Sequence, residues 1–163
     1  MPKEAEGKTG KPTDKRLKPK RPRDDLGRPQ PWESPNELEL EDFDNLSRDE
    51  NHRLGVEHFN SGRYFPAHEA WETAWKQSRD TPDAEFFKGL SQLGAGYVHL
   101  LRGNRHGATT LLRRAARRIK AYPAGHFGIN TREVSARSEE DAKSIERGDI
   151  TPGREALTDA PRV

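Results

Sequence analysis

Residues 59–75 read FNSGRYFPAHEAWETAW, and this segment decides the fold expected for the chain. Ser61 and Gly62 form a typical end to a helix. Pro66 suits the first turn of the next helix, because its missing N–H has no helical partner at that position. A helix from Pro66 to about Ser78 carries one histidine, two glutamates and two tryptophans. The segment therefore predicts the turn of a helical hairpin and a second helix rich in polar and aromatic side chains.

Helix signals recur on both sides of this segment. Ser47 and Glu50 have the spacing of a capping box, in which each side chain accepts from the backbone N–H of the other residue. Thr81 is the expected cap of a third helix, and Asn130 or Thr131 that of a weaker fifth. No segment alternates as a strand would. We therefore predict an all-α fold, a compact bundle of about five or six helices around two hairpins, with helices over about 47–60, 66–78, 81–101, 105–121 and 131–146.

Composition divides the chain into four parts. A stretch rich in Lys, Arg and Pro at the N-terminal end cannot bury enough apolar surface to offset ordering, so it is expected to be disordered. An acidic linker or short helix follows, and then the helical domain and a disordered C-terminal tail. The expected boundaries are 1–31, 32–46, 47–147 and 148–163.

Composition also limits the class of protein. The chain has 163 residues, of which 34% are charged and 30% hydrophobic, and it contains no cysteine, which excludes disulfides and thiolate metal sites. The longest apolar-leaning segment, 86–101, is interrupted by polar residues and is too short to cross a bilayer. We expect no membrane association and a cytoplasmic location.

The two hairpins repeat each other at an offset of about forty residues. The repeat pairs small residues that let helices approach closely, and it places Trp71 opposite Leu112. The spacing resembles that of tetratricopeptide hairpins, so an interaction module, with a protein partner or a second copy of the chain, is one predicted function. The paired positions are Gly55 with Gly96, His58 with His99, Gly62 with Gly103, Ala67 with Ala108, Trp71 with Leu112 and Ala74 with Ala115.

Residues 59–75 carry a His68-x-x-x-Glu72-x-x-Trp75 motif, and the turn at 102–108 reads Arg-Gly-Asn-x-x-Gly-Ala. With Gly89-Leu90-x-Gln92 and Gly128-Ile129, these motifs resemble the family known as domain of unknown function 309 (DUF309), over about residues 47–146. The resemblance implies a compact helical bundle and an unassigned site around His68, Glu72 and Trp75. It implies no reaction.

His68 and Glu72 lie four residues apart and share one face of their helix, with Trp75 one turn further. On the next helix Gln92 and His99 form a polar stripe. If the two stripes meet, they form a pocket that could bind a small polar ligand, or a divalent metal through His68, Glu72 and His99, or allow a Glu–His pair to act as a general base. A purely structural polar network is the alternative, and enzymatic activity is left open. The candidate cluster comprises His68, Glu69, Glu72, Trp75, Gln92 and His99.

The helix over 105–121 is rich in arginine. Arg113 with Arg117, and Arg114 with Arg118, form adjacent rows four residues apart. Such rows are usually a solvated basic face. Together with the basic N-terminal stretch they could also contact a nucleic-acid backbone without reading its sequence, which is a third predicted function.

Overall fold

A computed structural model describes residues 20–163 of the chain. The prediction of an all-α bundle is confirmed: these residues form five α-helices and two short 3₁₀ helices, and no strand beyond an isolated bridge between Arg23 and Pro29. Most of the predicted basic tail, residues 1–19, lies outside the described residues. The helices are α1 (Arg48–Asn60), α2 (Tyr64–Gln77), α3 (Ala84–Leu101), α4 (Arg105–Ile119) and α5 (Thr131–Arg147), with η1 (Phe43–Asn45) and η2 (His126–Gly128).

The helix caps follow the local sequence at two of the predicted places. Ser47 and Glu50 form both hydrogen bonds of the capping box, and the Asn130 side chain accepts from the N–H of Glu133. The start of α3 differs from the prediction. The Thr81 hydroxyl donates to the carbonyl of Ser78 at 2.6 Å and so shapes the preceding turn, and the helix begins at Ala84.

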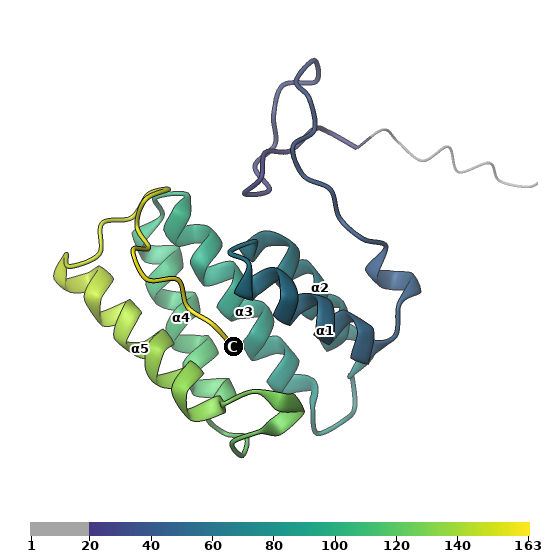
Figure 1. Ribbon diagram of the computed structural model, residues 1–163, viewed down its shortest axis with the longest axis vertical. Helices are drawn as coiled ribbons and strands as arrows, with labels where there is room; N and C mark the ends of the chain where they lie inside the picture. The colour runs from purple at the N-terminus through teal and green to yellow at the C-terminus, as the bar shows by residue number, and fades with distance from the viewer. Residues whose placement is uncertain (1–19) are drawn as a thin grey trace, which may run out of the picture.

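Consecutive helices pack on one another in a zigzag: α1 on α2, α2 on α3, α3 on α4 and α4 on α5 (Figure 1). The short connections 61–63 and 102–104 force α2 and α4 to run back along α1 and α3. The pattern of contacts is that of two stacked hairpins closed by α5. Among residues 20–163, no helix combines the length and apolar character that a bilayer-spanning segment needs.

The internal repeat corresponds to real close contacts between helices. A Cβ atom on Gly55 would lie 2.5 Å from the indole of Trp71, and one on Gly96 would lie 2.8 Å from the side chain of Leu112. Trp71 and Leu112 are both fully buried. Each hairpin thus inserts one large side chain of its second helix against a glycine of its first, because only glycine leaves room for it.

The repeat extends to the hydrogen bonds of the two turns. The N–H of Arg63 donates to the carbonyl of His58 at 2.9 Å, and the N–H of Asn104 donates to that of His99 at 2.8 Å. The side chains repeat the pattern, since Arg63 Nε and Asn104 Nδ2 each lie 3.0 Å from Nδ1 of the corresponding histidine. Both turns therefore share one geometry, in spite of different donor side chains.

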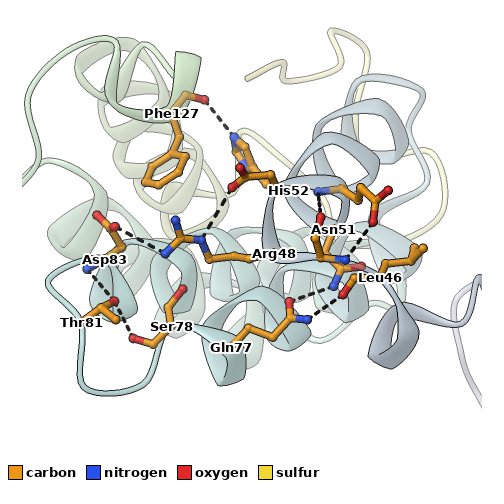
Figure 2. A network of polar contacts seen from close by, with 12 residues as sticks. Leu46, Arg48, Asn51, His52, Gln77, Ser78, Thr81, Asp83 and Phe127 are labelled. Atoms are coloured by element: carbon orange, nitrogen blue, oxygen red, sulfur yellow. Dashed lines mark hydrogen bonds and ion pairs between the residues drawn. The ribbon is translucent and has the colours of Figure 1, made fainter.

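A buried histidine links the first hairpin to the turn before α5 (Figure 2). Trp71 Nε1 donates to His52 Nδ1 at 3.1 Å, and His52 Nε2 lies 2.9 Å from the carbonyl oxygen of Phe127. Since that oxygen can only accept, Nε2 carries the ring proton and the imidazole is neutral. Burial lowers the pKa of His52, in agreement with a neutral ring.

The same network fixes the start of α1 against the loop between α2 and α3 (Figure 2). The Asn51 side chain donates to Gln77 Oε1 at 2.9 Å, and Gln77 donates to the carbonyl of Leu46 at 2.8 Å. Arg48 Nη1 lies 3.6 Å from Asp83 Oδ2. The Cζ atom of the same guanidinium lies over the Phe127 ring, 5.2 Å from its centroid. These contacts join three elements through polar groups at one end of the bundle.

The segments that flank the bundle are irregular. Residues 20–42 form an arm whose Leu26 carbonyl accepts from the guanidinium of Arg102, just after α3. Residues 148–163, predicted from the sequence to be disordered, lie against the helices (Figure 1). Arg154 of this segment pairs with Asp25 of the arm at 2.8 Å. The two flanking segments thus touch each other as well as the bundle.

Candidate metal-binding cluster

The candidate cluster is centred on His68, in the second turn of α2. The backbone of His68 lies against Gly94 of α3, where a Cβ atom would approach within about 3.0 Å of it. This close approach brings the imidazole over Ser91, also on α3. The position of the ring is therefore set by two small residues of the neighbouring helix.

Ser91 determines which nitrogen of His68 is free. His68 Nδ1 lies 2.9 Å from the carbonyl oxygen of Ser91 and 3.0 Å from its hydroxyl. Because a carbonyl oxygen only accepts, we assign the proton to Nδ1, which leaves the lone pair of the neutral ring on Nε2. Metal-binding histidines are typically held in this way, with the second nitrogen donating to a backbone carbonyl.

Two carboxylates face the free nitrogen. Glu69 Oε1 lies 3.7 Å and Glu72 Oε2 lies 3.6 Å from His68 Nε2, and one donor atom of each of the three residues lies within 4.8 Å of the others. All three side chains are partly exposed. The separations exceed those of hydrogen bonds, but ligands that share one divalent ion at about 2.1 Å are spaced only slightly more closely. The arrangement leaves room on its outer side for water or a further ligand.

Gln92 and His99 take part in other contacts. Gln92 Oε1 accepts from Arg118 of α4 at 3.0 Å. His99 Nδ1 accepts from Asn104, whose amide orientation is fixed because its oxygen caps Gly107 N–H at 3.0 Å. Burial lowers the pKa of His99, and the nearby charge of Arg102 adds to this effect. His99 is thus neutral, and its Nδ1 already accepts a hydrogen bond from Asn104.

Trp75 and two lysines border the cluster. The Lys88 ammonium lies 5.2 Å from the centroid of the Trp75 ring, as in a cation–π contact. Lys76 Nζ lies 3.6 Å from Glu72 Oε1, on the carboxylate's other oxygen. Lys76 therefore offsets part of the negative charge of the cluster.

Two residues that sequence reasoning missed, Ser91 and Gly94, are those that hold His68 in place. They form a pair of small side chains three residues apart on α3, a spacing typical of close helix contacts. That spacing was readable from the sequence. It could not show that the pair faces α2 at the level of His68.

An open groove lies beside the cluster. It has a volume of about 1080 Å³ and is formed between α2 and the arm, with Glu69 and Phe65 on the helix side. Lys20, Arg21 and Arg23 contribute positive charge from the arm side, and Glu39 contributes an acid. Glu69 therefore connects the cluster to a charged and accessible space.

The arginines of α4 are only partly free for another partner. Arg113 pairs with Glu146 and approaches Glu139 within 3.8 Å, and Arg118 pairs with Glu85 at 2.9 Å. Arg114 and Arg117 are exposed and form no ion pair within residues 20–163. Binding of a nucleic-acid backbone by this row stays a prediction, since half of the row is already neutralised.

These features define a small all-helical protein made of two stacked hairpins and a closing helix, with a His–Glu–Glu cluster on α2. The family model described as "Domain of unknown function (DUF309)" matches residues 52–111. The resemblance is thereby confirmed over this part of the chain, which is similar to the DUF309 family. The match includes the cluster and both hairpin turns, and it ends within α4. Comparisons with curated proteins and with solved structures found no match.

Proposed function

We propose that the protein binds a divalent transition-metal ion, such as Zn²⁺ or Mn²⁺, through His68, Glu69 and Glu72. The observation that supports the proposal is the hydrogen bond from His68 Nδ1 to the Ser91 carbonyl, because it leaves Nε2, which faces two carboxylates, as the nitrogen available to a metal ion. One imidazole and two carboxylates suit ions of intermediate hardness better than Mg²⁺, which prefers oxygen ligands and water. Compared with the sequence-based ligand set, Glu69 takes the place of His99. We expect this binding to occur in the cytoplasm, as the composition indicates.

Such an ion would retain open coordination positions on its solvent side. It would act as a Lewis acid toward an oxygen ligand that enters from the groove next to Glu69. The chain's own contribution is to hold His68 in one orientation through Ser91.

Metal titration of the purified full-length protein tests the proposal. Calorimetry with Zn²⁺ and with Mn²⁺ should show one saturable site, and a ligand at one hundred times its Kd should stabilise the fold by about 2.7 kcal/mol. His68→Ala should abolish the binding, whereas His106→Ala, which alters an exposed histidine on α4, should retain it. Equal binding by the two variants, or no binding by the wild type, would contradict a site at His68.

A second candidate function is that of a protein-interaction module. The observation that favours it is the recurrence of the same hairpin geometry in α1–α2 and α3–α4, down to the hydrogen bonds of the turns. Stacked hairpins of this kind expose one row of helices along a continuous face, which is suited to an extended ligand.

A further inference from the structure

The chain's own C-terminal segment contacts α1, α3 and α5, the odd-numbered helices (Figure 1). The N–H of Gly153 donates to the carbonyl of Leu100 at the end of α3, at 2.9 Å. Arg137 of α5 binds Asp159, and Asn60 at the end of α1 binds Val163. This one segment thus contacts three helices, α1, α3 and α5, that do not pack directly after one another in the zigzag.

Two side chains of the bundle bind the backbone of this segment. Asn60 Nδ2 donates to the carbonyl of Val163 at 3.2 Å, and Asn60 Oδ1 accepts from its N–H at 2.9 Å. Arg137 donates to the carbonyl of Asp159 and also to its carboxylate, at 3.3 Å for the latter. Backbone pairing of this kind selects an extended chain, while side-chain contacts add specificity.

Arg137 is held in position without help from the segment. Its Nε lies 2.9 Å from Oδ2 of Asp141, and the same buried carboxylate accepts from the Tyr97 hydroxyl at 2.6 Å. Asp141 fixes one edge of the Arg137 guanidinium and is itself held by Tyr97. The other two nitrogens of Arg137 therefore remain directed at Asp159. The binding group is therefore preorganised.

The segment fills the face only partly. Pro161 is buried, and the half-buried Leu157 and Val163 pack against the core. The Asp159 side chain is 89% exposed apart from its contact with Arg137. A cavity of about 350 Å³ remains between α5 and the segment, next to Leu157 and Asp159. Loose packing and exposed charge are expected of a ligand that exchanges.

We propose that α1, α3 and α5 form a peptide-binding groove, which residues 150–163 occupy as a tethered competitor. The external ligand is an extended protein segment with an acidic residue, a proline two positions later and an aliphatic residue two positions after that, as in Asp159-x-Pro161-x-Val163. This inference rests on the second candidate function, for which it supplies a surface and a ligand, and it is independent of the metal site. A tethered segment acts at an effective concentration on the order of millimolar, so an outside peptide of similar affinity competes poorly with it.

The test uses the full-length protein and a fluorescent peptide with the sequence of residues 151–163. Asp159→Arg in the protein places two like charges at Arg137 and should release the tethered segment. The peptide should then bind this variant at least tenfold more tightly than the wild type. Adding Asn60→Ala to the variant should remove the gain, and a control peptide that itself carries Asp159→Arg should not bind.

Hydrogen exchange shows whether the segment has been released. Val163→Asp serves as a second releasing variant, and in both variants the amide of residue 163 should lose its protection. Retained protection in both, or failure of the peptide to bind once protection is lost, overturns the proposal. A protein partner captured equally by wild type and Asn60→Ala would support an interaction function while removing this groove.

Discussion

His52 shows how one residue connects the sequence to the pH dependence of the fold. Its ring accepts from Trp71 and donates to the Phe127 carbonyl, and the first contact requires the neutral form because a protonated ring has no acceptor nitrogen. Burial lowers its pKa in the folded protein. The unfolded chain therefore takes up a proton at a higher pH than the folded one does. Stability from this residue is present above the ordinary histidine pKa of about 6.5 and is lost as the pH falls below that value.

His52→Gln should flatten the pH dependence of stability between about pH 7.5 and pH 5. Glutamine offers one acceptor and one donor to replace the contacts of the ring but takes up no proton. The slope of the unfolding free energy should decrease by up to about 1.4 kcal/mol per pH unit, measured by urea unfolding at each pH. His106→Gln, at an exposed position, is the matched control. An unchanged slope in His52→Gln would show that His52 does not titrate differently on folding.

At the scale of elements, the two hairpins should respond alike to equivalent changes. Gly62 and Gly103 end α1 and α3 with φ of 76° and 83°, and a Cβ atom at either position would meet nothing within 4 Å. Gly62→Ala and Gly103→Ala should therefore each cost about 1 to 2 kcal/mol, because the left-handed backbone alone opposes the change. Chemical denaturation of the two variants measures both costs. A large difference between the two costs would mean that the two turns, although alike in sequence, differ in their backbone energetics.

The sequence predicts most of the elements but only part of the site. Glycines at 55 and 96, the capping box at Ser47 and the cap at Asn130 are local signals, so the hairpins and most helix limits followed from them. The face of α3 that meets His68 is not a local property. It depends on the close approach at Gly94, which turns Ser91 toward the imidazole, while Arg118 draws Gln92 toward α4. A single sequence does not specify this rotation between helices.

At the scale of the whole molecule, one aromatic cluster runs through the bundle. Trp71 contacts Phe59, which contacts Tyr97 of α3, with ring centroids 5.7 Å apart in both pairs. Burial raises the pKa of Tyr97 well above its ordinary value, and its hydroxyl reaches Asp141 of α5. The core therefore links the first hairpin to the closing helix without interruption. A loss of packing at one point of this core should destabilise all five helices.

Trp71→Ala should lower the unfolding free energy by about 3 to 5 kcal/mol, since it removes a fully buried side chain that fills the space at Gly55. For a domain of ordinary stability, about 5 to 15 kcal/mol, this is a large share. Because the aromatic cluster is continuous, the loss should appear in a single cooperative transition, measured by circular dichroism. Amide exchange should accelerate in α4 and α5 as well as in α1 and α2. Accelerated exchange confined to the first hairpin would show instead that the hairpins unfold independently, as units of a repeat array do.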